Sequence, residues 1–187
     1  LNEVDVNSAT AAMLKLSELG LWIDDTPRIS PMTLRMRMRR AQARHPFACM
    51  YVDYLQLLDG SAGAGRRGDR VAEVGYIATE LKQTARELGI PLIVAAQLSR
   101  TLENRADKRP MLADLRESGS IEQEADQVAF LYRQDVYYGP NDPQYDLSMK
   151  DVSEVLVRKN RNGDLGEFHL KWDGAARRLV EPQMKKI

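Results

Sequence analysis

The chain has 187 residues, of which 43% are hydrophobic and 29% charged, a composition typical of one folded domain. Its 27 basic and 27 acidic residues cancel, so a surface for nucleic acid would have to be local. The single Cys49 excludes an internal disulfide and favours a reducing, cytoplasmic setting, while the two histidines lack the cysteine partners of a zinc site. No apolar stretch reaches the roughly 20 residues of a membrane span, so we expect no membrane partner.

The N-terminal part of the sequence predicts helices that alternate with short strands. A helix over residues 7–19 precedes a short strand over residues 21–23. A Ser-Pro pair then starts a second helix, which ends near Arg44. The apolar run 48–52 predicts the next strand, and this strand ends at Asp53.

The clearest helix is predicted over residues 71–88, where apolar residues recur at helical spacing until Gly89. A loop rich in Gly, Ala and Arg over residues 59–70 precedes this helix, and a strand over residues 91–96 follows it. Strands separated by helices imply a parallel sheet with helices on its faces.

A highly charged segment over residues 114–126 lies between the apolar runs 91–96 and 127–132, which predict buried strands. A charged segment with a glycine in this position is usually a loop that carries a site. The fork of Arg116 fits phosphate oxygens, and Gly119 permits close approach of the backbone. A surface network between Arg116 and Glu117 is the alternative interpretation. The loop 59–70 offers a second set of cations, or is a plain solvated loop; these cations are Arg66, Arg67 and Arg70.

The last part of the sequence predicts antiparallel strands. Asn162-Gly163 is a strong hairpin signal between strands over residues 154–159 and 166–172. A loop over residues 139–143 precedes these strands, and a last strand is predicted around residues 178–180. Lys159 and Arg161 flank the hairpin tip, where a stiff hairpin could present them to a neighbouring subunit's nucleotide. Alternatively, these cations only protect the hairpin from pairing with another edge.

Two polar residues follow predicted strands and are candidates for a nucleotide site. Asp53 ends one strand, and Gln97 ends the next one along the chain. Ligands of open parallel sheets bind at the carboxyl ends of strands, where a carboxylate can hold a water bound to Mg²⁺ beside a nucleotide. Either residue could instead cap a turn or simply end a strand.

Three segments, taken together and in this order, resemble DnaB-type replicative DNA helicases. They are Tyr-Val-Asp-Tyr-Leu-Gln-Leu-Leu at 51–58, Asp-Leu-Arg-Glu-Ser-Gly at 114–119 and Lys-Asn-Arg-Asn-Gly at 159–163. The resemblance covers about residues 20–181. It implies an α/β fold of the RecA type, with a mostly parallel sheet flanked by helices and an antiparallel hairpin at the C-terminal end.

The resemblance also implies roles for the candidate residues. Asp53 would hold Mg²⁺ through water beside ATP, and Gln97 would sense the terminal phosphate. Arg161 would be an arginine finger that acts on the next subunit, with Lys159 as its companion. The residues implied to hold single-stranded DNA are Arg116, Glu117 and Gly119. The implied partners are the other subunits of a homohexamer, a helicase loader and primase.

A phosphate loop of the form GxxxxGK[ST] does not occur in the sequence. Residues 1–187 are therefore expected to be the C-terminal part of a motor domain, without its P-loop portion and N-terminal domain, and inactive alone. Leu1 in place of a starting Met agrees with a fragment. Two alternatives stay open at this point: another RecA-fold ATPase such as a recombinase, and a non-catalytic adaptor that keeps the fold.

Overall fold

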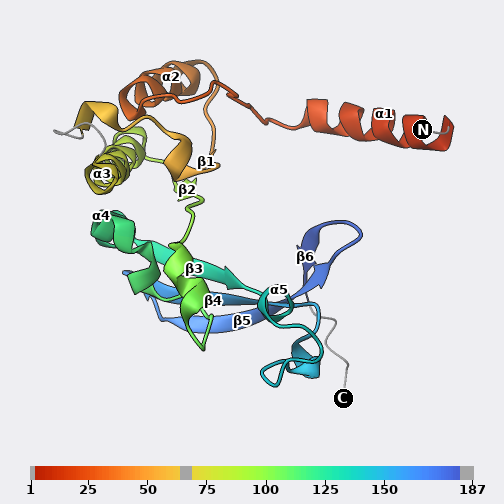
Figure 1. The fold of residues 1–187 in the computed structure, drawn as a ribbon. Helices are drawn as coiled ribbons and strands as arrows, with labels where there is room; N and C mark the ends of the chain where they lie inside the picture. The colour runs from red at the N-terminus through yellow and green to blue at the C-terminus, as the bar shows by residue number, and fades with distance from the viewer. Residues whose placement is uncertain (1–2, 64–68, 182–187) are drawn as a thin grey trace.

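The computed structural model describes residues 3–63 and 69–181, without the side chains of residues 3–5 and 116–118. Three parts follow one another along the chain (Figure 1). A projecting helix comes first, then two helices beside a small parallel sheet, and then an antiparallel sheet with short helices at both ends. Within these described residues, no helix combines the length and apolar character that crossing a bilayer requires.

The first helix, α1 (Glu3–Glu18), extends away from the other elements (Figure 1). The helix predicted over residues 7–19 is confirmed, although it begins earlier. The strand predicted over residues 21–23 is wrong, since these residues form no regular structure and Ile23 is 82% exposed. A strand needs a neighbour to satisfy its backbone groups, and none of the described strands pairs with this segment.

The next two helices, α2 (Pro31–Arg44) and α3 (Arg70–Leu88), end close to the predicted residues because the sequence supplies their caps. The side chain of Ser30 accepts a hydrogen bond from a first-turn amide of α2, and Asp69 does the same for α3. Gly89 closes α3 in the left-handed conformation at φ 67°, which costs least for glycine.

The parallel sheet consists of β1 (Met50–Val52) and β2 (Leu92–Val94), in register with Val52 opposite Val94. The apolar stripe of α3 packs against this sheet and against α2, and Ile77 at its centre is fully buried. This core is the first of two, and its buried members are Leu34, Met50, Val52, Leu55, Leu58, Val74, Ile77 and Leu81.

The charged segment is helical, which corrects the prediction of a loop over residues 114–126. It forms a 3-10 helix, η4 (Leu112–Ser118), followed by α4 (Gly119–Glu124). Its apolar residues recur at helical spacing, but the many charged residues around them favour the prediction of a loop. Leu115 is 7% exposed, and Ile121 packs against both hydrophobic cores. The segment therefore joins the two halves of the molecule.

Four antiparallel strands follow in the spatial order β3-β4-β5-β6. They are β3 (Gln127–Tyr132), β4 (Val152–Asn160), β5 (Gly166–Asp173) and β6 (Arg178–Val180). The predicted strands and hairpin are confirmed here. The second core lies on one face of this sheet, and its buried members are Leu115, Val128, Phe130, Tyr132 and Leu156.

The hairpin between β4 and β5 is wider than the two-residue turn that Asn-Gly favours. The last β4–β5 pair is Val157 with Gly166, whereas Lys159 pairs with Val128 of β3. The register of β3 and β4 shifts at this point, so Arg158 is the extra residue of a β-bulge. The last residues of β4 therefore pair with β3 and not with β5. As a result, Lys159 and Arg161 lie next to the start of β3.

The remaining elements are short helices in the connections. They are η1 (Leu55–Leu57), η2 (Ser61–Gly63), η3 (Arg100–Asn104), α5 (Gln134–Tyr137) and η5 (Leu147–Met149).

The molecule is of the mixed α/β class, but it is less parallel than predicted. Among the described strands, only β1 and β2 pair in parallel, and β3 pairs with β4 instead of extending their sheet. An antiparallel partner that is close in sequence is easier to reach than a parallel one. The free edge of β2 and the free edge of β3 are left facing one pocket.

Candidate nucleotide and DNA site

Asp53 and Gln97 lie at the same edge of the parallel sheet, as predicted. Asp53 directly follows β1, and the ladder continues past β2 through a 2.9 Å hydrogen bond from the Ala95 amide to the Val52 carbonyl oxygen. Both side chains are exposed. Ligands of parallel α/β sheets bind outside this edge, so the two polar groups have the right placement for a nucleotide site.

Gln56 is a residue of this edge that the sequence prediction missed. Its side-chain amide donates to the Gln97 carbonyl oxygen at 3.0 Å and accepts from the Gln97 amide at 3.1 Å. The main-chain oxygen of Gln56 accepts a 2.8 Å bond from Arg70. Gln56 therefore fixes the backbone that carries Gln97. A polar residue inside the apolar run 54–58 was the signal that could have identified it.

Lys159 and Arg161 lie against the C-terminal end of α4 in the same chain. Lys159 donates to the main-chain oxygens of Glu122 and Gln123. Arg161 donates to the main-chain oxygen of Gln123 at 2.6 Å and lies 3.4 Å from the carboxylate of Asp126. Cations at a helix C-terminus interact favourably with its free carbonyl groups.

Asp126 is the acidic partner of this group, and sequence reasoning gave it no role. Lys82 of α3 also binds its carboxylate. The hydrogen bond from Lys82 and the nearby positive charges of Lys82, Arg161 and Arg86 lower the pKa of Asp126. The side chain is thus held as a carboxylate between α3 and the hairpin. Its signal in the sequence was an acid directly before an apolar strand.

The predicted DNA residues are placed by their backbone. Arg116 and Glu117 lie in η4, and Gly119 is the first residue of α4. The side chains of Arg116 and Glu117 lie outside the described part of the structure, as do Arg66 and Arg67 of the earlier loop.

The start of the η4 segment is held by its own contacts. Asp114 is 5% exposed, accepts a 2.8 Å bond from the Met111 amide and forms a 2.9 Å ion pair with Arg105. These contacts hold the N-terminal end of η4 in place.

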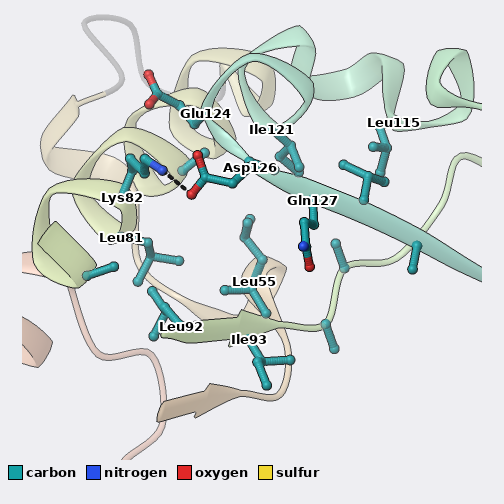
Figure 2. Close-up of a pocket in the computed structure, with 18 of the residues that line it drawn as sticks. Leu55, Leu81, Lys82, Leu92, Ile93, Leu115, Ile121, Glu124, Asp126 and Gln127 are labelled. Atoms are coloured by element: carbon teal, nitrogen blue, oxygen red, sulfur yellow. Dashed lines mark hydrogen bonds and ion pairs between the residues drawn. The ribbon is translucent and has the colours of Figure 1, made fainter. Parts of the chain in front are cut away.

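A pocket with a volume of about 780 Å³ lies between β2 and β3. Figure 2 shows Leu92 and Ile93 of β2 on one side and Ile121 of α4 and Gln127 of β3 on the other, with Leu81 of α3 at the left. The ion pair of Lys82 and Asp126 lies at its border (Figure 2). Most of its lining residues are apolar, and the open edges of β2 and β3 border it.

The structure thus forms two separate groups from the predicted site residues. Asp53 and Gln97 share the edge of the parallel sheet, and Lys159 and Arg161 share the end of α4. No hydrogen bond or ion pair joins these groups among the described residues. That part of the chain also holds no cluster of three or more His, Cys, Asp or Glu side chains able to bind a metal.

Comparison with known proteins shows the family of this chain. A family model described as the DnaB-like helicase C terminal domain matches residues 1–181. The chain belongs to this family. The matched range includes Asp53, the η4–α4 segment and the hairpin.

Similar curated proteins agree with this assignment. The chain is 46% identical over 171 residues to the replicative DNA helicase DnaC of Bacillus subtilis (strain 168), covering 91% of this chain and 36% of the relative. It is 44% identical over 170 residues to the replicative DNA helicase DnaB of Geobacillus stearothermophilus, again covering 91% of this chain and 36% of the relative. The chain therefore spans a little over a third of these relatives.

Solved structures show the same fold for this DnaB-like chain. One is described as an ATPase domain and matches with a TM-score of 0.83 and 34% identity, over 97% of this chain and 61% of that one. Another, described as a DnaB-like replicative helicase and its interactions with primase, matches with a TM-score of 0.84 and 33% identity, over 98% of this chain and 42% of that one. The mixed α/β fold of this chain is therefore shared with both of these solved structures.

Proposed function

We propose that this chain is the C-terminal part of the motor of a replicative DNA helicase, in which ATP hydrolysis drives movement along single-stranded DNA. The observation that carries the proposal is the pair of exposed polar residues, Asp53 and Gln97, at the carboxyl edge of a parallel sheet in a DnaB-like domain. The cytoplasmic setting expected from the sequence belongs to the same proposal.

The proposed nucleotide site uses Asp53 and Gln97 in different ways. Mg²⁺ is bound in such sites by one or two carboxylates together with water and phosphate oxygens, and a single exposed carboxylate at a strand end fits this donor set. When bound, Mg²⁺ would neutralise charge that develops on the phosphates. Gln97 would donate its amide to the terminal phosphate, and Gln56 would keep the backbone of Gln97 in place.

The proposed trans-acting residues are Arg161 and Lys159. In a homohexameric ring, the hairpin would face the nucleotide of the next subunit, where the guanidinium stabilises the charge of the transferred phosphoryl group. The 46% exposed side chain of Arg161 supports this role, because it leaves part of the guanidinium accessible.

The proposed DNA contacts belong to the η4–α4 segment, at Arg116, Glu117 and Gly119. Phosphate contacts by Arg116 and by backbone amides near Gly119 would give affinity without base selectivity. A helicase loader and primase are proposed as further partners. The interaction with primase is named for one of the similar structures.

The phosphate loop is proposed to come from another part of a longer protein, since the sequence contains no GxxxxGK[ST]. The apolar pocket between β2 and β3 supports this division, because one added parallel strand there would pair with two open edges. We therefore expect no DNA-stimulated ATPase from the purified 187-residue chain. Robust turnover by the chain alone would contradict this division.

The decisive experiment tests Arg161 in the full-length protein that contains this chain. Arg161→Ala should leave ring assembly and ATP binding intact and lower the ATPase kcat by about 10³-fold. The matched control is Arg178→Ala, which removes an exposed arginine from another strand of the same sheet and should change little.

Mixed rings then separate action within one subunit from action between subunits. Subunits with Arg161→Ala are mixed with subunits that lack a working phosphate loop, and native mass spectrometry verifies the mixed rings. Recovered activity above either parent is expected, because some interfaces combine an intact phosphate loop with an intact Arg161. Mixed rings without recovery would refute the trans-acting assignment.

A further inference from the structure

The hairpin cations rest on a small group of acceptors at the end of α4, here called the α4 cradle. It consists of the main-chain oxygens of Glu122 and Gln123 and the carboxylate of Asp126. Lys159 and Arg161 both donate into it. Because the cradle lies between the η4–α4 segment and β3, it connects the proposed DNA segment with the proposed nucleotide cations.

The backbone brings Arg161 to this cradle independently of the side-chain contacts. The Arg161 amide donates to the Asp126 carbonyl oxygen at 2.9 Å. The β-bulge at Arg158 sets Lys159 opposite Val128, next to the start of β3. A bulge of this kind redirects the side chains that follow it. The hairpin tip is therefore held at Asp126, the same residue whose carboxylate lies beside the Arg161 guanidinium.

The carboxylate of Asp126 is shared between two cations. One oxygen binds Lys82 of α3, and the other lies 3.4 Å from Nη1 of Arg161. Lys82 is mostly buried and anchors the carboxylate from the side of α3, whereas Asp126 and Arg161 are half exposed. The pair of Asp126 with Arg161 is exposed, and an exposed ion pair adds little to stability, so the value of this second contact lies in orienting Arg161.

The contacts leave donors of Arg161 available. The guanidinium has five N–H donors in a rigid plane, and its described contacts involve only Nη1 and Nη2. Nη2 donates to the Gln123 main-chain oxygen, and Nη1 contacts the Asp126 carboxylate. These two contacts within the same chain set the orientation of the guanidinium plane. A fork fixed in this way loses less conformational entropy when it binds an anion.

We propose that Asp126 is a positioning residue for Arg161, orienting its guanidinium toward the phosphates of the neighbouring subunit's nucleotide. This inference rests on the proposed function, in which Arg161 acts in trans. Removing the carboxylate leaves a long, flexible side chain attached only through Gln123, and a loss of orientation lowers the rate of a reaction that depends on placement. Lys82 contributes through Asp126, because it holds the carboxylate from the other side.

The test uses the full-length helicase that contains this chain. Asp126→Asn keeps the size of the side chain and removes its charge, so the DNA-stimulated ATPase kcat should fall by about tenfold, while the KM for ATP and ring assembly stay unchanged. Asp126→Glu restores the carboxylate and should recover most of the lost rate. Lys82→Met should lower kcat in the same direction by a smaller factor.

The matched control is Asp164→Asn in the hairpin loop. The side chain of Asp164 is exposed and has no hydrogen-bond or ion-pair partner among the described residues, so kcat should stay within about twofold of the parent. An equal loss in Asp126→Asn and Asp164→Asn would overturn the proposal, because the effect would then follow from hairpin charge in general.

A double-mutant cycle separates this inference from the proposed function. If Asp126 acts through Arg161, Asp126→Asn should cause no further loss in a protein that already carries Arg161→Ala. If the kcat losses of Asp126→Asn and Arg161→Ala were fully additive, the positioning role would be overturned. If Arg161→Ala itself leaves kcat unchanged, the trans-acting assignment fails. If Arg161→Ala lowers kcat but Asp126→Asn does not, only the positioning role fails.

Discussion

The two sheets of this chain differ in where their strands find partners. In the antiparallel sheet, β4 pairs with β3 on one side and with β5 on the other, and Leu156 at its centre is fully buried. In the parallel sheet, β1 and β2 have only each other among the described strands, and Ile93 is 50% exposed. Hairpins connect partners that are close in sequence, whereas parallel strands need crossovers and partners from distant segments. Within the described residues, β4 and β5 therefore have partners on both sides, whereas β2 and β3 each leave one edge open at the pocket.

The largest expected effect compares two buried leucines, one in each half. Leu156→Ala should lower the free energy of unfolding by about 4 kcal/mol, since the filled sheet around it cannot collapse into the cavity. Leu81→Ala should cost only about 2 kcal/mol, because Leu81 lines the pocket and its neighbours can relax into it. Urea titration of both variants measures the difference. The control Leu147→Ala, at a side chain that is 74% exposed, should change less than about 0.5 kcal/mol. Equal losses at Leu156 and Leu81 would remove the distinction between the halves.

Hydrogen exchange should reveal the open edge of β2. The Ala95 amide bonds to β1, so the alternating amides of Leu92 and Val94 point to the opposite side, toward the pocket. We expect these two amides to exchange about 100-fold faster than the amide of Leu156 in the middle of β4. In the full-length protein, pairing at this edge should slow them. Slow exchange in the chain alone would mean that the edge is already protected.

A substitution of glycine by alanine tests the packing of the parallel half. A Cβ on Gly60 would lie 2.7 Å from the Glu73 carbonyl oxygen in α3, so the backbone would have to move. Gly60→Ala should therefore destabilise the chain by about 2 kcal/mol, as overpacking does. Gly139→Ala is the control, because a Cβ there meets nothing within 4 Å. Thermal unfolding of both variants gives the comparison, and a neutral Gly60→Ala would contradict the close contact.

The smallest expected effect concerns Asp24, at the junction of the N-terminal segment with α2. Hydrogen bonds from Thr26 and Arg37 lower the pKa of Asp24 to about 2. Its contribution is present above the unfolded pKa of about 3.9 and is lost as the pH falls through about 2. Because the pair is 44% exposed on both sides, Asp24→Asn should cost only about 0.5 kcal/mol at pH 7 and nothing below about pH 2. Unfolding at several pH values measures this, with Asp25→Asn as control; a pH-independent difference would exclude the ionic contribution.

Sequence patterns predicted best the elements that carry their own local signals. The helices α2 and α3 were found from Ser30, Gly89 and the apolar stripe of α3. The hairpin was found from Asn162-Gly163, although the turn itself is wider than this pair favours. The prediction failed where the structure of a segment depends on pairing with another part of the chain. Residues 21–23 have strand composition but no neighbouring strand among those described.

The candidate site could be predicted in part for the same reason. Asp53 and Gln97 were located because strand ends are visible in the sequence. The role of Gln56 depends on a contact with Gln97, and the role of Asp126 depends on cations from α3 and from the hairpin. Long-range contacts of this kind leave no periodic pattern. The assignments of Arg116, Glu117 and Gly119 to DNA stay predictions.

The bulge at Arg158 also limits how the length of this chain can change during evolution. Successive residues of a strand point to opposite faces, so losing this one residue would turn Lys159 away from α4 and displace Arg161 from the Asp126 carbonyl group. Insertions and deletions should therefore be tolerated in the connection over residues 138–150, which lies outside the ladder, and selected against between residues 152 and 161. Deletion of the single codon for Arg158 should therefore be enough to misplace Lys159 and Arg161.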